Sequence, residues 1–188
     1  MRTSYRGWRG LAVTLAAVAV ALAPTAGASA QSPSKDSDTL VIARGQSIDS
    51  LNPYFTRNVI DDEVIQLSYE TLVRRSAKDY GYVPGLSTKW QPSEDGRTWT
   101  FTIRDNSKWS DGKPVTAHDA AFTYQQLIDN KDIHARHFDF ASKLESVEAT
   151  DEHTLVLTTK QPTPLVLSFA LPILPKHIWE KVDDPAKY

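Results

Sequence analysis

Two histidines near the middle of the chain have the side chains and spacing that could bind a metal ion. His134 and His137 lie three residues apart, and Asp132 and Asp139 flank them. Imidazole nitrogens and carboxylates are common zinc and nickel ligands, and residues three apart share a helix face. The pattern fixes no third ligand, however. The sequence therefore predicts no resident metal or cofactor and keeps His134 and His137 as the candidate pair.

A second dense cluster runs from Trp109 to Phe122 (WSDGKPVTAHDAAF). Asp111-Gly112 is typical of a tight turn. Thr116-x-x-Asp119 resembles a capping box, in which the threonine hydroxyl accepts an N–H bond and the carboxylate accepts the Thr116 N–H. His118 falls on the exposed first turn of the helix that follows. The cluster therefore predicts a turn and a capped helix rather than a reactive site.

Catalytic signatures are missing from the rest of the sequence. The chain contains no cysteine, so disulfides, thiolate zinc sites and cysteine nucleophiles are excluded. It has no Gly-x-Ser-x-Gly, no His-Glu-x-x-His and no phosphate-binding glycine loop. We predict that the protein is not an enzyme, and a metal-dependent enzyme is the disfavoured third hypothesis.

The N-terminus has the pattern of a cleavable secretory signal over residues 1–30. Arg2, Arg6 and Arg9 precede the apolar run at residues 11–23, and Ala28-Ser29-Ala30 matches the small-x-small cleavage pattern. A membrane anchor is the alternative, although the run is short for a bilayer span. Without cysteine, the protein is not expected to be a lipoprotein. Export to the periplasm or the cell exterior is the expected location.

Charge argues against nucleic-acid binding. The full chain has 21 basic and 23 acidic residues, and removing residues 1–30 leaves 18 against 23, a net charge of −5. Nucleic-acid binders usually carry a basic stripe instead.

Hydrophobic periodicity predicts a mixed α/β domain with antiparallel strand pairs, after a flexible polar leader at 31–38. In the strand at 98–104, Trp99, Phe101 and Ile103 alternate with threonines, as in a half-buried strand. The other predicted elements are a buried strand at 39–43, a helix from 61–63 through Leu72, a helix at 117–130, a hairpin of 146–150 with 154–158, and a short helix in 165–171.

Five motifs in order resemble the family 5 extracytoplasmic solute-binding proteins, which are the oligopeptide, dipeptide and nickel-chelate receptors of ABC importers. The longest runs from Trp90 to Phe122 and includes SEDGRTWTFTIRDNSKWSDGKPVTAHDAAF. The others are Thr39-Leu-Val-Ile with Ser50-Leu-Asn-Pro53, Glu70-Thr-Leu-Val73, Asp151-Glu-His-Thr-Leu155 and Pro172-Ile-Leu-Pro-Lys-His177. Asn52 and Thr71 depart from the usual aspartate and glycine. The resemblance covers residues 39–188.

The resemblance implies a type II periplasmic-binding-protein-like clamp of two lobes, of which this chain would supply the N-terminal part of the larger lobe. It also implies two ligand-contacting segments. In the first, Thr56, Arg57, Asn58 and Val59 would meet the backbone of an extended peptide, as in strand addition. In the second, an aromatic side chain, Phe138 or Phe140, would face the ligand.

The resemblance thus predicts a substrate-binding component, or a fragment of one, that delivers peptides or similar small solutes to ABC permease subunits. Contact with the membrane would occur only through the permease. We expect the chain alone to bind peptides weakly, because the main charge clamps of the family lie in the other lobe. The alternative is a secreted interaction or structural domain without a transport role.

Overall fold

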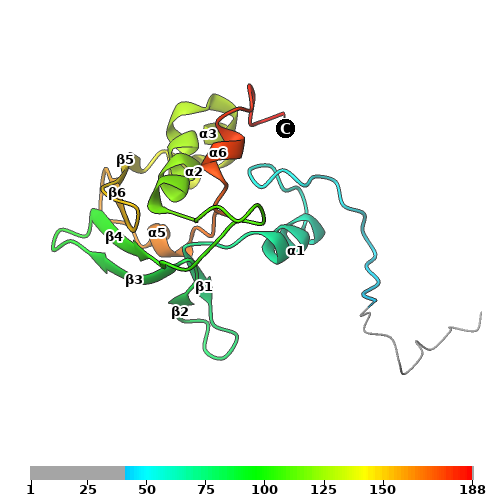
Figure 1. The fold of residues 1–188 in the computed structure, drawn as a ribbon, viewed down its shortest axis with the longest axis horizontal. Coiled ribbons are helices and arrows are strands. Elements are labelled where there is room, and N and C mark those ends of the chain that lie inside the picture. The colour runs from blue at the N-terminus through cyan, green and yellow to red at the C-terminus, as the bar shows by residue number, and fades with distance from the viewer. Residues whose placement is uncertain (1–40, 188) are drawn as a thin grey trace, which may run out of the picture. The chain divides into compact units, whose positions relative to one another are not determined.

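Antiparallel pairing builds the sheets of this protein, for which a computed structural model describes residues 41–187. The larger sheet has the strand order β3-β4-β6-β5 and contains β3 (Ser87–Pro92), β4 (Thr98–Ile103), β5 (Leu144–Ala149) and β6 (Thr154–Thr159) (Figure 1). The smaller sheet is a hairpin of β1 (Val73–Arg75) and β2 (Tyr82–Pro84). The predicted signal at 1–30, the leader at 31–38 and residues 39–40 lie outside the described residues.

The central strand β4 shows why this sheet has one buried face. Phe101 and Ile103 are fully buried, whereas Thr100 and Thr102 on the opposite face are exposed. Phe101 pairs with Leu155 of β6, which is also buried. A half-buried strand requires this alternation with a period of two. The predicted strand is therefore confirmed, with Phe101 and Ile103 buried as expected and Trp99 partly buried.

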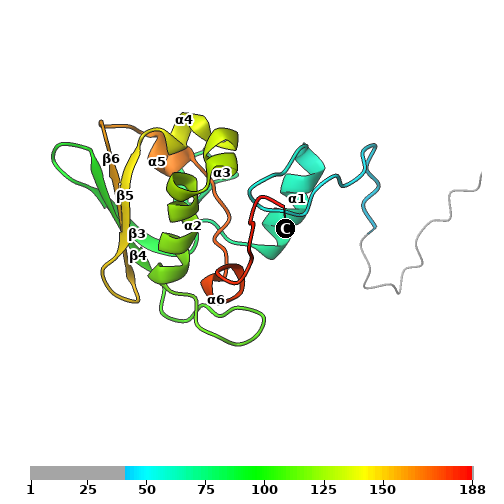
Figure 2. The same cartoon turned by 90° about the horizontal axis from the view of Figure 1, so that it is seen from above.

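Helix α2 (Ala117–Asp129) lies over the buried face of the sheet, together with α3 (Lys131–Arg136) and α4 (Phe138–Ala141) (Figure 2). Its inner stripe consists of Ala117, Ala120, Tyr124 and Leu127, all nearly inaccessible to solvent. Their spacing follows the helical period. The predicted stripe is confirmed at Ala117 and Tyr124, but Ala121 and Ile128 lie beside it and are only partly buried.

The start of α2 has the predicted capping box, in which the side chains of Thr116 and Asp119 each meet a backbone N–H of the other residue. The Asp119 carboxylate accepts the Thr116 backbone N–H at 2.8 Å, as expected. The Thr116 hydroxyl also donates to the same carboxylate oxygen at 3.3 Å. The predicted capping box is therefore confirmed, and His118 is exposed as predicted.

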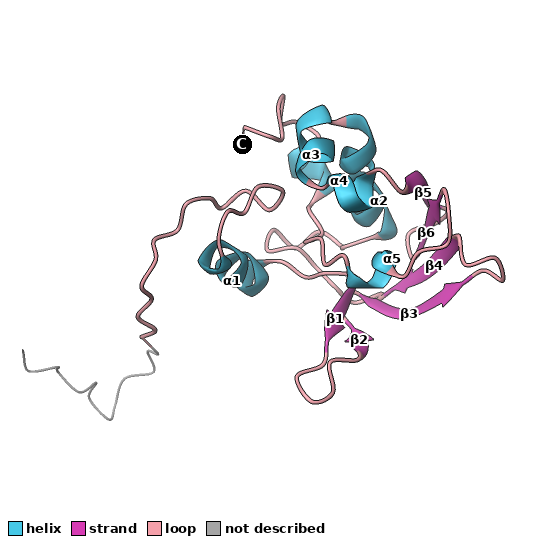
Figure 3. Cartoon of the chain, turned by 180° about the vertical axis from the view of Figure 1, so that it is seen from behind, coloured by secondary structure: helices cyan, strands magenta, loops and turns pink. Residues whose placement is uncertain are grey.

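Three further helices lie before and after these elements. Helix α1 (Val59–Ser68) precedes β1, and the short helices α5 (Leu165–Ser168) and α6 (Lys176–Trp179) follow β6 (Figure 3). The predicted hairpin is confirmed by the antiparallel pairing of β5 with β6, and the predicted helix within 165–171 is confirmed by α5. Residues 43–187 belong to one compact unit. No helix in the described part is long and apolar enough to cross a bilayer.

Two sequence expectations are wrong. Residues 41–43 form no strand, and Val41 and Ile42 are 80% and 64% exposed. A strand needs a ladder partner for its backbone groups, and no strand pairs with these residues in the described part. The first helix ends at Ser68 rather than Leu72. The Thr71 and Leu72 carbonyls instead accept the backbone N–H groups of Leu86 and Ser87, at 2.8 and 2.9 Å.

Candidate functional site

The loop that leads into α1 is ordered by its own polar side chains. The side-chain oxygen of Asn58 caps α1 by accepting the backbone N–H groups of Ile60 and Asp61 at 2.9 and 3.1 Å. The buried Asp61 carboxylate accepts the N–H groups of Asp49 and Arg57 at 2.9 and 2.8 Å. Burial alone would raise the pKa of Asp61, but these backbone donors outweigh it and hold the pKa below its usual value. The loop is thus held around a charged carboxylate.

Tyr54 anchors this loop in the core. Its side chain is 1% exposed, and its hydroxyl donates to the Thr123 carbonyl of α2 at 3.0 Å. Its ring meets Trp179 of α6 edge to face, with centroids 5.9 Å apart. Its backbone N–H donates to the Asn52 side chain at 3.0 Å. Burial raises the pKa of the Tyr54 phenol, so this side chain is a neutral structural anchor at pH 7.

The second predicted segment docks directly on this loop. His137 Nε2 lies 2.8 Å from the Tyr54 carbonyl oxygen. A carbonyl only accepts, so Nε2 is the donor in this contact. The Arg136 guanidinium donates to the Thr56 carbonyl. Two segments about 80 residues apart in sequence, each predicted separately to contact ligand, therefore meet in one place.

We call this surface the candidate binding face and define it by residues of the loop and of the helical segment that follows α2, together with Phe169 after α5. Its members are Tyr54, Thr56, Arg57, Arg136, His137, Phe138 and Phe169. Phe169 closes the group because its ring meets the His137 imidazole edge to face, with centroids 5.5 Å apart.

Two hollows adjoin the candidate binding face. One, of about 510 Å³, is lined by Thr56, His137 and Phe169 together with residues of α1 and the β1–β2 hairpin. The other, of about 500 Å³, is lined by Arg136, His137, Phe138 and Phe169. His137 and Phe169 line both hollows. The face thus presents a concave, partly aromatic surface next to backbone groups of an ordered loop.

The six predicted ligand-contacting residues lie in different environments. Arg57 is exposed, Val59 is 65% exposed and Thr56 is partly buried, whereas the Asn58 side chain is occupied in capping. Phe138 is 60% exposed. Phe140 is 2% exposed and stacks on Phe169 with centroids 4.4 Å apart. Of the two aromatic candidates, only Phe138 presents its ring to solvent, and the ligand contacts themselves stay predictions.

The histidine pair shows no metal-binding arrangement. His134 Nδ1 lies 2.8 Å from the Leu127 carbonyl, and His137 Nε2 is used by Tyr54. No group of three or more potential ligands comes together in the part of the chain that the structure describes. Each imidazole instead fixes a helix junction or a loop through a carbonyl.

Sequence reasoning missed the roles of Tyr54, Asn52 and Phe169. Asn52 donates from Nδ2 to the Pro185 carbonyl at 2.8 Å, a contact across 133 residues. No local pattern reveals such a contact. The adjacent aromatic residues Tyr54 and Phe55 in this loop were the signal that the sequence offered for an anchor.

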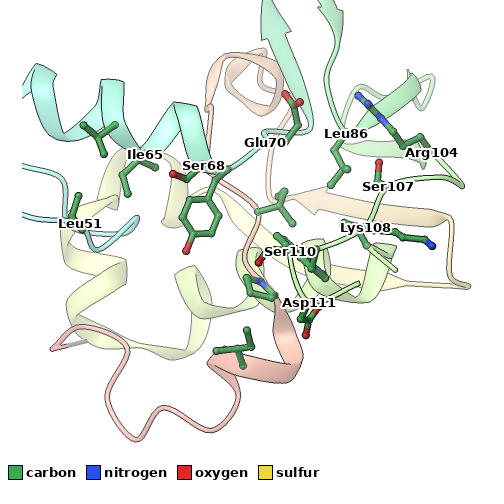
Figure 4. A pocket seen from close by; sticks show the side chains of 17 residues that line it. Leu51, Ile65, Ser68, Glu70, Leu86, Arg104, Ser107, Lys108, Ser110 and Asp111 are labelled. Carbon is green, nitrogen blue, oxygen red and sulfur yellow. The ribbon is translucent and has the colours of Figure 1, made fainter. Parts of the chain in front are cut away.

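A larger hollow, of about 690 Å³, contains none of the predicted ligand-contacting residues. It lies between α1, the loop that holds Ser107 to Asp111 and the segment around α6 (Figure 4). Leu51, Ile65 and Leu86 give it apolar walls, and its charged lining residues are of both signs: Arg104, Lys108, Glu70 and Asp111. The indole nitrogen of Trp109, which also lines it, has no hydrogen-bond partner among the described residues.

Comparison with known proteins places this architecture in one family. The family model described as bacterial extracellular solute-binding proteins, family 5 Middle, matches residues 81–188. The periplasmic oligopeptide-binding protein OppA of Salmonella typhimurium is 32% identical over 169 residues, which is 79% of this chain and 31% of that protein.

Solved structures agree. NikZ from Campylobacter jejuni, in complex with Ni(L-His), matches with a TM-score of 0.66 and 26% identity over 76% of this chain and 28% of its own. Haemophilus influenzae OppA, in complex with the peptide RPPGFSPFR, matches with a TM-score of 0.62 and 30% identity over 72% and 30%.

The chain belongs to the family 5 bacterial extracellular solute-binding proteins. Its mixed α/β fold matches type II periplasmic binding proteins over part of their length. These relatives are solute-binding proteins and not enzymes. The chain spans about a third of the length of the relatives it matches.

Proposed function

We propose that this chain supplies one wall of a solute-binding site in the substrate-binding component of an ABC importer, and that the solutes are peptides or similar small molecules. The candidate binding face is that wall. The observation that carries the proposal is the docking of Arg136 and His137 on the carbonyls of Thr56 and Tyr54. It joins the two segments that the family resemblance assigns to ligand contact.

The chemistry of the face suits an extended peptide or a small polar solute. Thr56 and Arg57 lie in an ordered, non-helical stretch whose geometry is set by the Asp61 carboxylate. A pre-ordered backbone lowers the entropy that binding must overcome. The exposed Phe138 ring offers an apolar contact beside it. Two relatives are solved with a nonapeptide and with a nickel–histidine chelate, which makes these two molecules the natural probes.

Nuclear magnetic resonance titration of the purified 188-residue chain tests the proposal, since it detects weak binding. The peptide RPPGFSPFR and Ni(L-His) would be titrated separately to millimolar concentration. We expect one of them to shift amide signals of residues 54–59 and 134–140 while signals of β5 and β6 stay in place. Saturating titrations that leave the candidate binding face unchanged would refute the proposed function.

Location and partners follow from the same proposal. The matched OppA of Salmonella is periplasmic, and we propose that this chain is exported by the predicted signal at residues 1–30 and works outside the cytoplasm with ABC permease subunits. Fractionation of expressing cells tests this step. Recovery of uncleaved chain in the cytoplasm would contradict it.

A secreted interaction domain without a transport role is the second candidate. The observation in its favour is the set of large apolar side chains that lie open on this unit, including Leu51, Val59 and Leu67 at 59%, 65% and 87% exposure. A partner that covers these side chains would remove apolar surface from water. A chain that binds neither probe but forms a defined complex with another envelope protein would favour this candidate.

A further inference from the structure

The Asp61 carboxylate joins two points of the chain that lie on either side of Tyr54. Its Oδ1 accepts the Asp49 N–H at 2.9 Å, and its Oδ2 accepts the Arg57 N–H at 2.8 Å. Asp61 itself is fully buried. The two bonds close residues 49–57 into a loop that begins and ends at one side chain, and we call this closed loop the Asp61 ring.

Asn58 ties the start of the ring to α1 by a second route. Its Nδ2 donates to the Asp49 carboxylate at 3.1 Å and to the Ser47 carbonyl at 3.4 Å. Its side-chain oxygen accepts the N–H groups of Ile60 and Asp61. The start of the Asp61 ring and the first turn of α1 therefore form one hydrogen-bonded unit.

Only a carboxylate can close the ring at both ends. Each oxygen of Asp61 serves a different N–H group, so two acceptor atoms are needed. An asparagine side chain has the same shape but offers one oxygen, and its NH₂ group would face an N–H donor. The negative charge also lies in the first turn of α1, where the helix dipole stabilises it.

The ring contains residues that the proposed function assigns to the ligand. Tyr54 in its middle is anchored in the core through its hydroxyl and its aromatic ring, and the Thr56 carbonyl accepts from Arg136. These contacts fix the middle of the ring. The end of the ring at Arg57 is fixed by the Asp61 carboxylate.

We propose that Asp61 is a positioning residue of the candidate binding site: its carboxylate holds residues 49–57 in a preformed ring, and the ligand binds to the closed ring. The role in binding rests on the proposed function. Closure of the ring is a property of the ligand-free protein, so the two parts can be decided separately.

A quantitative relation distinguishes positioning from a general effect on stability. If only the closed ring binds, the apparent dissociation constant equals the intrinsic one divided by the fraction of closed rings. A variant that opens the ring must therefore lose affinity by the ratio of its closed fraction to that of the wild type. A residue that only stabilised the whole domain would instead loosen the ring and the central strand β4 together.

Hydrogen exchange of the ligand-free 188-residue chain at about pH 7 measures the closed fraction. The reporters are the bonded amides of Asp49, Tyr54 and Arg57, with β4 amides as the reference for global unfolding. Asp61→Asn should lower protection at the reporters about tenfold or more, because an N–H group loses a charged acceptor. Protection in β4 should change by less than about twofold. Glu63→Gln is the matched control, since Glu63 lies on the same helix and pairs with Arg44, and it should keep wild-type protection.

A second pair of variants opens the ring from its other end without touching the buried carboxylate. Asp49 is exposed, and Asp49→Pro removes its N–H group. Asp49→Ala keeps the N–H group and loses the same contact with Asn58. Protection at Tyr54 and Arg57 should therefore fall severalfold further in Asp49→Pro than in Asp49→Ala.

The binding part is tested by titrating the wild type and Asp61→Asn with RPPGFSPFR and with Ni(L-His). We expect the probe that binds the wild type to bind Asp61→Asn severalfold more weakly, by the ratio of the closed fractions. An Asp61→Asn variant with an open ring and full affinity would refute the positioning role and leave the proposed function standing.

Wild-type protection at the reporters of Asp61→Asn, or equal protection in the two Asp49 variants, would overturn closure of the ring by Asp61. If Asp61→Asn unfolds altogether, the exchange and the titration of the two Asp49 variants decide both parts. Failure of both probes to bind the wild type refutes the proposed function and the positioning role with it, while the exchange data still decide whether Asp61 closes the ring.

Discussion

Asp119 at the start of α2 joins that helix to the segment that begins α6. One carboxylate oxygen accepts the Thr116 N–H at 2.8 Å, and the other accepts the Lys176 N–H at 2.9 Å. The side chain is 5% exposed. Although its sequence motif predicts only a helix cap, Asp119 also ties together residues 57 positions apart.

Replacing Asp119 with alanine should therefore cost more than an ordinary helix cap. Two backbone N–H groups lose a charged acceptor, and each such bond contributes about 1.5–3 kcal/mol. We expect Asp119→Ala to lower the free energy of unfolding by about 3 kcal/mol, measured by urea denaturation. Asp129→Ala is the control on the same helix, because its exposed side chain bonds only Gln125. Equal effects of the two variants would contradict the bridging role.

The hydroxyl and the ring of Tyr54 should each contribute to the free energy of unfolding. Tyr54→Phe removes the donor to the Thr123 carbonyl and should cost about 1–2 kcal/mol of unfolding free energy. Tyr54→Ala also removes a buried ring and should cost about 3–5 kcal/mol. Tyr80→Phe provides the control, since Tyr80 is 77% exposed. Thermal unfolding compares the three variants, and a Tyr54→Phe variant as stable as Tyr80→Phe would rule out the anchor.

Local sequence patterns predicted most of the sheet and α2. Alternation in β4 and the turn at Asp151 to His153 depend on neighbouring residues, so they are readable from the sequence. Gly112, in the predicted Asp-Gly turn, adopts a φ of 87°, which glycine tolerates without strain. The family resemblance was equally local, because its motifs lie within such elements.

The first strand and the end of α1 could not be predicted in this way. Val41 and Ile42 have strand-forming side chains, but pairing depends on a distant partner. Thr71 and Leu72 continue the helical spacing of α1, yet their carbonyls bond to residues 86 and 87. In both places, long-range contacts override local preference.

For the same reason, the sequence predicted residues of the candidate site but not the contact between its two segments. The sequence marked Thr56, Arg57, Phe138 and the histidine pair, but not that the two segments would touch. Docking depends on the fold, which brings His137 to Tyr54 across 83 residues. The sequence predicted no metal and kept the two histidines as a candidate pair, and in the structure each imidazole contacts a backbone carbonyl.

Gly85 should tolerate no side chain. A Cβ at this position would overlap the carbonyl oxygen of Thr71 and touch that of Leu72 at 3.0 Å, and both atoms are backbone. The added methyl group of Gly85→Ala must therefore push residue 85 away from the backbone of Thr71 and Leu72, which lie just before β1. We expect a loss of about 2 kcal/mol or more in unfolding free energy. Gly45→Ala is the control, because nothing lies within 4 Å of its added carbon. A Gly85→Ala variant as stable as Gly45→Ala would show that the close approach is absent in solution.

Alanine substitutions of the two phenylalanines of α4 should have different effects, one on the free energy of unfolding and the other on ligand binding. Phe140 is buried and stacked on Phe169, so Phe140→Ala should cost about 3–5 kcal/mol of unfolding free energy. Phe138 is 60% exposed, and Phe138→Ala should change stability by less than about 0.5 kcal/mol. If Phe138 contacts ligand, the same substitution should reduce the amide shifts that RPPGFSPFR or Ni(L-His) causes at residues 54–59. Denaturation and titration of the two variants decide this together. A Phe138→Ala variant that binds the effective probe as well as wild type would remove Phe138 from the binding site and leave the loop at 54–59 as its remaining predicted contact.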